Sequence, residues 1–183
     1  DIEDSSNDIE APWTIINAYF SKQHLQQLVR HQIESYNDFI TRQIPNTIDM
    51  FNPVLICSEH DYHKDSNKYR LEIFITFQNF GIYRAQIHEN NGATKLMFPH
   101  EARLRNFTYA SNMTLDINIK YIIRTGNMLE NIQTIYKTLP KIHIGKIPIM
   151  LRSTVCVLTH YKHISPDSTG ECKMDPGGYF IIN

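Results

Sequence analysis

The chain has 183 residues, enough for one domain with its own hydrophobic core. Hydrophobic residues make up 42% and charged residues 20% of the chain, which is the composition of an ordinary globular domain. The formal net charge of -1 excludes a chain that is basic overall, so any contact with nucleic acid must come from a local patch.

The cysteines and the first residues indicate the compartment. Cys57, Cys156 and Cys172 are an odd and scattered set, which argues against a disulfide framework and favours a reducing environment. The acidic N-terminal residues are the reverse of a signal peptide, and no apolar run approaches the roughly 20 residues that span a membrane. The sequence therefore predicts an intracellular protein without membrane contact.

Helices are predicted in the first quarter of the chain. Residues 1–11 are expected to form a disordered acidic tail, because they lack apolar residues to offset the entropy of ordering. Pro12 is placed to begin one helix. Ser21 is the predicted cap of a longer second helix, whose apolar residues recur every three or four positions until Pro45 ends it.

Strands dominate the middle of the chain. Residues 54–57 are a short candidate strand, residues 69–77 alternate clearly between apolar and polar, and residues 81–88 are expected to pair beside them. Asn90-Asn91-Gly92 predicts a hairpin turn into residues 94–98. Residues 99–106 are expected to form one helical turn or a structured loop, and residues 113–123 the longest strand.

A last helix completes the predicted fold. Asn127 and Glu130 resemble a capping box, which predicts a helix that Pro140 closes. The fold class is therefore α+β: N-terminal helices followed by a mostly antiparallel sheet, with helices packed on one face. Residues 12–183 are expected to form a single domain.

The run from 144 to 183 is the most distinctive part of the sequence. Gly145 and Pro148 interrupt its first apolar segment, which predicts a bent strand. Pro176, Gly177 and Gly178 then predict a tight turn that leads into a buried β-rich segment. Because the sequence stops within that segment, we expect the domain to be truncated at residue 183.

Four blocks carry a resemblance to a known family. Ile-Gly-Lys-Ile-Pro-Ile-Met-Leu-Arg-Ser (144–153) and Asp-Pro-Gly-Gly-Tyr-Phe-Ile-Ile-Asn (175–183) closely resemble motifs near the N-terminus of the second-largest subunit of multisubunit DNA-directed RNA polymerases, of the eukaryotic and large-DNA-virus type. Residues 98–109 and, more weakly, 13–39 match the same subunit in the same order. The motif positions expected to be structural are Pro99, Glu101, Arg103, Arg105, Asn106, Gly145, Pro148, Arg152, Pro176, Gly177, Gly178 and Asn183.

The resemblance implies a function for the chain. It implies the N-terminal part of that subunit, within the domain called the protrusion, which forms one wall of the nucleic-acid cleft. It further implies RNA synthesis on a DNA template, with Mg²⁺ and Zn²⁺ bound elsewhere in the polymerase and no cofactor on this segment. Implied partners are the other subunits, above all the largest one, the DNA template and the RNA–DNA hybrid. The implied location is the nucleus, or the host cytoplasm or virion if the source is viral.

The alternative is a free-standing α+β binding or interaction module without enzymatic activity. The two hypotheses predict different sequences after Asn183 in the reading frame. The polymerase family predicts Gly-Ser-Glu-Lys or a similar sequence there, whereas a complete module predicts a stop codon or a linker.

Candidate catalytic and metal residues are weak in this sequence. It holds no nucleophile elbow, no phosphate-binding glycine loop and no aspartate cluster for two magnesium ions, so no catalytic residue is predicted. Cys57, His60 and His63 have metal-ligand spacing, but a fourth ligand would have to come from far along the chain. We therefore interpret them as part of a polar loop, and likewise the acidic residues of the later loop, Asp167, Glu171 and Asp175.

Four cations are candidates for facing nucleic acid. Arg103 and Arg105 can reach phosphate, but the favoured interpretation is that Glu101 and nearby carbonyls hold them to shape the loop. For Lys146 and Arg152 the structural and the nucleic-acid interpretations both stay open.

Overall fold

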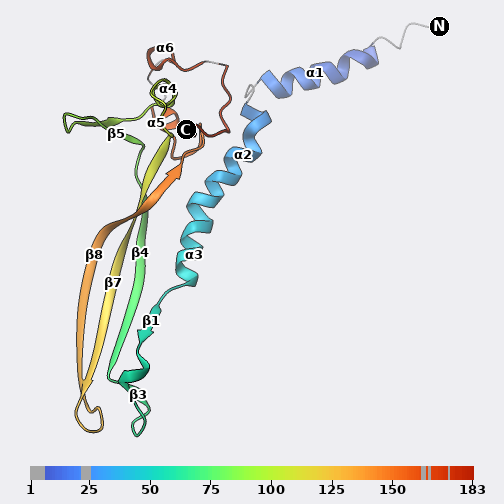
Figure 1. Cartoon of the computed structure of the whole chain (residues 1–183). Coiled ribbons are helices and arrows are strands. Elements are labelled where there is room, and N and C mark those ends of the chain that lie inside the picture. Colours follow the sequence, from blue (N-terminus) through green and yellow to red (C-terminus); the bar gives the residue numbers. More distant parts are fainter. Residues whose placement is uncertain (1–6, 22–25, 162–163, 165, 173) are drawn as a thin grey trace. The chain divides into compact units, whose positions relative to one another are not determined.

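The computed structural model describes residues 7–21, 26–161, 164, 166–172 and 174–183 (Figure 1). The chain divides into two compact units: the first unit comprises Asp1–Asp38, Arg84–Ala110 and Pro148–Asn183, and the second unit comprises Phe39–Tyr83 and Ser111–Ile147. A single domain was predicted. The sequence shows no linker at the boundaries because they fall within continuous segments, such as the helical residues on either side of Asp38.

The first helix starts earlier than predicted. Helix α1 (Asn7–Ser21) includes part of the expected tail and contains Pro12, while residues 1–6 lie outside the described part of the chain. Acidic residues, which suggested a tail, are also favourable in the first turn of a helix. Ser21 ends α1 instead of capping the next helix, α2 (Gln26–Asp38). No helix of the described residues is long and apolar enough to cross a membrane.

Pro45 does not end the helical region. A π-helical segment, η1 (Phe39–Gln43), follows α2 directly and leads into α3 (Ile44–Met50), with Pro45 in the first turn of α3. Proline is tolerated there because backbone N–H groups of a first turn have no partner within the helix. The chain therefore changes from α-helix to π-helix and back to α-helix in the region where the sequence predicted that the helix would end.

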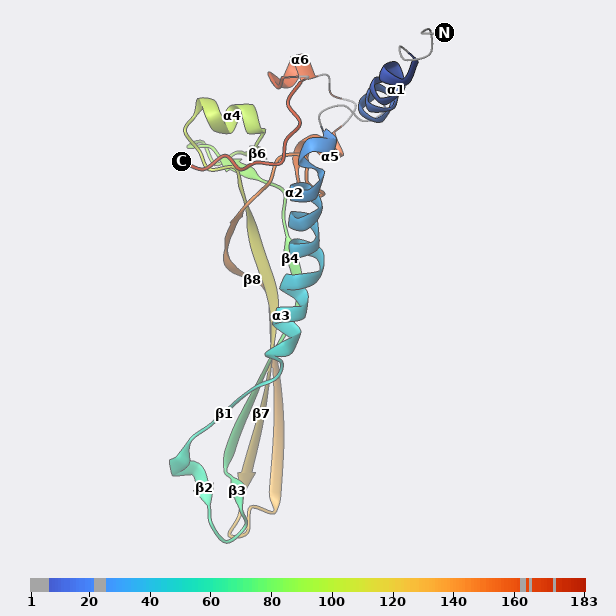
Figure 2. The same cartoon turned by 90° about the vertical axis from the view of Figure 1, so that its right-hand side faces the viewer.

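The second unit is built on a four-stranded sheet in the order β1-β4-β7-β8 (Figure 2). Its strands are β1 (Val54–Cys57), β4 (Leu71–Ile82), β7 (Ala110–Thr125) and β8 (Asn131–Pro148). β4 pairs antiparallel with β1, where Val54 lies opposite Ile75, and with β7, where Leu71 lies opposite Ile123. The α+β class and the mostly antiparallel sheet are confirmed.

The predicted helix after Asn127 is wrong. Residues from Asn131 onward form β8, which is the longest strand among the described residues. Its β-branched and aromatic residues favour a strand as much as the spacing of its apolar residues favours a helix. Pro140 fits because β8 lies at the edge of the sheet, where a missing donor can face outward.

Asp116 of β7 fixes irregular points in both neighbouring strands. Its carboxylate accepts hydrogen bonds from the Asn79 side chain of β4 and from the Lys141 backbone N–H of β8, each at 2.7 Å. Asn79 and Lys141 both have φ of 53°, and the register of β4 against β7 shifts between Gln78 and Gly81. The carboxylate thus holds the irregular part of β4 and the Lys141 backbone of β8 in place from β7.

Short hairpins complete the strand list. In the second unit, the 3-10 helix η2 (Glu59–Asp61) precedes the hairpin of β2 (Tyr62–His63) and β3 (Lys68–Tyr69). In the first unit, β5 (Gln86–His88) pairs with β6 (Thr94–Leu96), which confirms the predicted turn at Gly92. Residues 81–88 are not one strand beside β4: Gly81 and Ile82 end β4 itself, because the bulge prolongs it past Asn79.

The core of the first unit joins the sequence motifs. Tyr109, Ile149, Leu151 and Val157 are each at most 1% exposed. Two short helices contribute to this core: α4 (Pro99–Leu104) through Ala102 and α5 (Val157–His160) through Val157. A third short helix, α6 (Pro166–Thr169), belongs to the same unit. The backbone N–H of Ile149 donates to the carbonyl of Tyr109, so the first segment of the distinctive run continues as buried chain after β8 ends.

The C-terminal residues are extended but do not form the predicted strand. Leu151 N–H donates to the Tyr179 carbonyl, Gly178 N–H donates to the Leu151 carbonyl, and Tyr109 N–H donates to the Ile181 carbonyl. The segment therefore bonds to two different parts of the chain and does not form one ladder. Tyr179 and Phe180 are 39% and 40% exposed, not buried as expected. The predicted tight turn is present, because Gly177 and Gly178 have φ of 76° and 80°.

Candidate functional site

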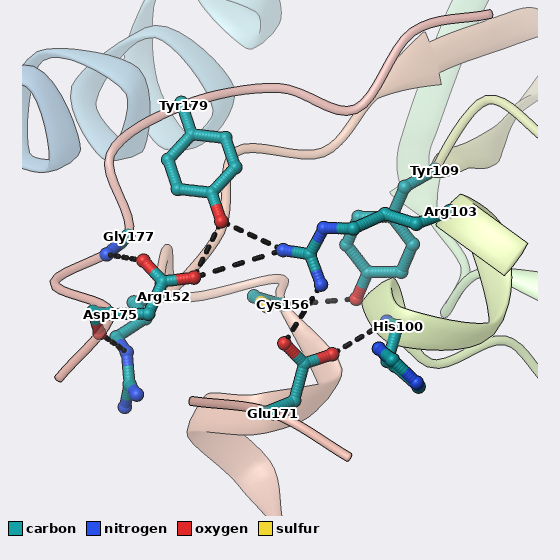
Figure 3. Close-up of polar contacts among 9 residues, drawn as sticks. All are labelled: His100, Arg103, Tyr109, Arg152, Cys156, Glu171, Asp175, Gly177 and Tyr179. Atoms are coloured by element: carbon teal, nitrogen blue, oxygen red, sulfur yellow. Dashed lines mark hydrogen bonds and ion pairs between the residues drawn. The ribbon is translucent and has the colours of Figure 1, made fainter. Parts of the chain in front are cut away.

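Arg103, on α4, is held by residues of the C-terminal loop (Figure 3). Its Nη1 lies 3.0 Å from Glu171 Oε2, and its Nη2 donates to the Tyr179 hydroxyl at 2.7 Å. The Asp175 carboxylate lies 3.7 Å from Nη2. Burial alone would lower the pKa of Arg103, but the hydrogen bond and charge of Glu171 outweigh it and the pKa is raised.

Glu171 is the buried partner in this cluster. Its side chain is 4% exposed, and its second oxygen accepts the backbone N–H of His100 at 2.6 Å. Asp175 accepts the Gly177 N–H at 2.9 Å and the hydroxyl of Tyr179. Together these contacts join the start of α4 to the glycine turn, so the geometry of the loop depends on two carboxylates and one guanidinium.

Arg105 belongs to a second, more exposed cluster. It donates to both carboxylate oxygens of Glu89 at 2.7 and 3.2 Å, and to Glu101 at 3.3 Å. Lys95 lies 2.7 Å from Glu101. The guanidinium also stacks over the ring of Phe107 at 4.9 Å. These contacts satisfy Arg105 within the chain and favour the loop-shaping interpretation.

The Glu89 carboxyl is expected to titrate well below its ordinary range. Hydrogen bonds from Arg105 and Lys95 lower its pKa from 4.5 to about 2. The pair therefore stabilises the fold above about pH 4.5, and that contribution is lost as the pH falls toward 2. Carbon-detected NMR titration should place the Glu89 midpoint near 2, and Arg105→Gln should raise it. An ordinary midpoint in the unsubstituted chain would contradict the bidentate contact.

The other two candidate cations lie in different units. Arg152, in the first unit, has φ of 64°, and its Nε donates to the backbone carbonyl of Asp175 at 3.1 Å. Lys146 is an exposed residue of β8, in the second unit. Within the described part of the chain Lys146 forms no ion pair. The structure therefore brings Arg103 and Arg152 to one loop of the first unit, while Lys146 belongs to the second unit.

The remaining motif positions lie in the C-terminal segment, in or just after α4 and at the end of β8. The Asn183 side chain donates to the Asn106 carbonyl at 2.7 Å, and Pro99 is fully buried. Gly145 has φ of 155°, and Pro148 ends β8. Pro176 immediately precedes the glycine turn.

Sequence reasoning missed several residues that hold the loop. Glu171 was considered only as a possible metal ligand, and no local pattern marks it as the partner of Arg103. Tyr36 of α2 donates its hydroxyl to the Pro148 carbonyl at 2.6 Å, and burial raises the pKa of Tyr36 to about 12. Asn37 accepts both the backbone N–H and the hydroxyl of Thr154. Tyr36 and Asn37 fall in the weaker motif block, which was the available signal.

Cys57 ends β1, His60 lies in η2 and His63 lies in β2. Cys57 is exposed, and His63 Nδ1 lies 3.1 Å from the Ser66 hydroxyl. Among the described residues, no three His, Cys, Asp or Glu side chains are close enough to hold a metal ion. His163 lies outside the described residues, and Glu171 and Asp175 already contact Arg103.

We predict that the purified chain carries no stoichiometric zinc, because a structural site needs four ligands and this group supplies three. Elemental analysis after exhaustive dialysis should give well under one zinc per chain, and Cys57→Ala should not change the value. One zinc per chain that disappears in Cys57→Ala would overturn the prediction.

Comparison with known proteins identifies relatives of the whole chain. A family model described as RNA polymerase beta subunit matches residues 27–183. DNA-directed RNA polymerase II subunit 2 of Arabidopsis thaliana is 34% identical over 185 residues, covering 100% of this chain and 15% of the relative. Subunit Rpo2N of Methanothermobacter thermautotrophicus is 32% identical over 174 residues, covering 95% of this chain and 29% of the relative.

A further relative has similar coverage. DNA-directed RNA polymerase II subunit RPB2 of Schizosaccharomyces pombe is 34% identical over 182 residues, covering 93% of this chain and 14% of the relative. The chain thus spans between 14% and 29% of the length of these three relatives. The match reaches across both units, since it includes the helices, the sheet and the C-terminal loop.

Proposed function

Because this chain belongs to the RNA polymerase beta subunit family, we propose that it is the N-terminal, protrusion-forming part of a second-largest subunit. In this role it lines part of the nucleic-acid cleft during DNA-templated transcription. The observation that carries the proposal is the match over residues 27–183, which contains all the motif residues tied together around Arg103.

The proposed role is structural rather than chemical. Arg103 and Arg105 are paired with carboxylates of the same chain, and no group of described residues forms an acidic cluster for magnesium. Nucleotidyl transfer would then use Mg²⁺ on another subunit, and structural Zn²⁺ would also lie elsewhere. The purified chain, given a primed template, nucleoside triphosphates and magnesium, is expected to make no RNA.

The proposed nucleic-acid surface is the β8 strand. It carries Lys137, Lys141 and Lys146 and no acidic residue. Arg103 and Arg105 are excluded from the proposed surface, because carboxylates of the same chain already hold them. Lysine side chains on an exposed strand can contact phosphates without reading sequence.

Cross-linking in the assembled polymerase tests this surface. A photoreactive amino acid at Lys146 of the full-length subunit should cross-link to nucleic acid in a transcribing complex. The same group at Leu104, which is 71% exposed but flanked by paired arginines, is the control and should not. Cross-linking from Leu104 but not from Lys146 would overturn the proposal that β8 is the nucleic-acid surface.

The chain alone is expected to bind DNA weakly and without sequence preference. A few lysines neutralise few phosphates, so log affinity should fall with log salt with a slope on the order of two. Lys146→Gln should reduce that slope by about one, measured by fluorescence anisotropy over a salt series. A salt-independent or sequence-specific affinity would contradict the proposal.

The proposed partners are other polymerase subunits, above all the largest one, together with the template and the RNA–DNA hybrid. The proposed location is wherever that polymerase works, the nucleus or a viral site of transcription. The second candidate, a free-standing interaction module, predicts that the chain does not co-purify with a largest subunit when the two are expressed together. Stable co-purification, with the reading frame continuing past Asn183, would exclude it.

A further inference from the structure

A small pocket in the first unit has an arginine at one side and apolar walls. Its volume is about 190 Å³, and its lining includes Arg152, Glu171, Phe98, Leu158, Tyr161 and Ile164. Small-molecule sites usually have roughly 300 Å³ or more. This pocket therefore has room for one or two side chains rather than for a nucleotide or a cofactor.

Only one nitrogen of the Arg152 guanidinium donates a hydrogen bond to the described part of the chain. Its Nε donates to the Asp175 carbonyl at 3.1 Å, while its Nη1 and Nη2 bond to no acceptor in the described part of the chain. Figure 3 shows these two terminal nitrogens without an interaction, in contrast to those of Arg103. Paired terminal N–H groups of this kind fit a carboxylate bidentately.

Arg152 has an unusual backbone conformation, and its side chain packs closely against Gly177. Its φ of 64° is unusual for a residue with a side chain, and such conformations persist only where the surroundings determine them. Its Cγ packs against Gly177, where an added Cβ would lie 2.7 Å away. The stem of the side chain is therefore anchored beside the pocket that Arg152 helps to line, so it has little freedom left to lose on binding.

The charges around the pocket favour a single carboxylate over a nucleic-acid backbone. Glu171 is part of the lining, and its charge is already matched by Arg103. Among the described lining residues Arg152 is the one cation, whereas nucleic acid is held by several phosphate contacts. The apolar side chains of the wall suit an aliphatic or aromatic neighbour of the bound carboxylate.

We propose that the Arg152 pocket binds an acidic side chain of a partner peptide segment, with an adjacent apolar side chain packed against Leu158, Tyr161 and Ile164. The pocket is therefore a protein-docking site, distinct from the β8 surface that is proposed for nucleic acid. Its chemistry does not depend on the chain's role in transcription.

Binding of a minimal peptide by the 183-residue chain tests the proposal. The probe is acetyl-Phe-Glu-amide, and its neutral match is acetyl-Phe-Gln-amide. NMR should show saturable shifts at the Arg152 Nε–H and at the Leu158 and Ile164 methyl groups, with an affinity on the order of millimolar for so small a ligand. The neutral peptide should bind at least about tenfold more weakly, because it removes the charge-assisted pair.

Substitutions distinguish binding at the Arg152 pocket from nonspecific attraction of the acidic peptide to positive charge. Arg152→Gln should weaken binding at least about tenfold, and Arg152→Lys by less, since lysine keeps the charge without the fork. Arg105→Gln is the matched control and should leave the affinity unchanged, because Glu89 already occupies Arg105. Should Arg152→Gln fail to fold, Ile164→Gln decides the question: Ile164 is 39% exposed, and its substitution should also weaken binding severalfold.

Equal affinity for the acidic and neutral peptides, or unchanged affinity in Arg152→Gln or Ile164→Gln, would overturn the proposal. So would tighter binding of a short single-stranded oligothymidylate at the same resonances, which would assign the pocket to nucleic acid. Inorganic phosphate alone should shift the Arg152 resonance weakly and leave the methyl resonances in place. If phosphate alone shifted the methyl resonances as much as the acidic peptide does, the proposal that the pocket binds an acidic side chain together with an apolar one would be contradicted.

Discussion

Replacing Arg103 with alanine is expected to lower the free energy of unfolding of the first unit by about 3 kcal/mol. The variant would leave Glu171, whose side chain is 4% exposed, without its charge partner. Removing one member of a buried ion pair typically costs about 3 to 5 kcal/mol. The lower end applies because the Arg103 side chain is 34% exposed and solvent screens part of the interaction.

Two matched variants isolate the cause. Arg105→Ala removes an arginine two residues away whose partners Glu89 and Glu101 are 28% and 25% exposed, so its cost should be much smaller than that of Arg103→Ala. In Arg103→Ala, the further change Glu171→Gln should restore part of the loss, because it removes the buried charge. Urea unfolding, monitored by near-ultraviolet circular dichroism of the tyrosines, measures the free energy of unfolding of Arg103→Ala, Arg105→Ala and the double variant. Equal effects of Arg103→Ala and Arg105→Ala would show that burial of Glu171 does not decide the energetics.

The long strands that were predicted correctly are those in which apolar and polar residues alternate and no local pattern favours a helix. Residues 69–77 and 113–123 alternate apolar and polar side chains. Residues 71–77 lie in β4 and residues 113–123 in β7, which pair antiparallel, whereas Tyr69 belongs to β3. β8 was missed because its apolar residues Ile132, Ile135, Tyr136 and Leu139 have helical spacing and an apparent capping box also favoured the helix. Its place at the sheet edge, which resolves the conflict around Pro140, is tertiary information that no local window contains.

The sequence singled out candidate residues, but it did not predict their contacts. The motif blocks contained Arg103, Arg152 and the glycine turn, and these do lie around one loop. The acidic partner was wrongly placed: Glu101 contacts Arg105, whereas Arg103 is held by Glu171, 68 residues further along the chain. Side-chain pairing at that separation is set by how the chain folds back, and composition offers no signal for it.

Gly177→Ala is expected to lower the free energy of unfolding of the first unit by about 3 kcal/mol. Its φ of 76° lies in the left-handed region, which costs an L-residue with a side chain roughly 1 to 2 kcal/mol. The added Cβ would also lie 2.7 Å from both the Leu151 carbonyl oxygen and Arg152 Cγ. The backbone oxygen cannot rotate away, so a steric cost of about 1 to 3 kcal/mol is added to the strain.

Gly92 of the β5–β6 hairpin provides the control for backbone strain alone. Its φ is 82°, close to that of Gly177, but an added Cβ would meet no atom within 4 Å. Gly92→Ala should therefore show only the conformational cost, roughly 1 to 2 kcal/mol, and both glycines belong to the first unit, so the same unfolding transition reports both. If the two variants were equally destabilised, the close packing of Gly177 against Leu151 and Arg152 would contribute nothing. The larger cost expected at Gly177 comes from that packing, which also holds the Arg152 side chain at its pocket.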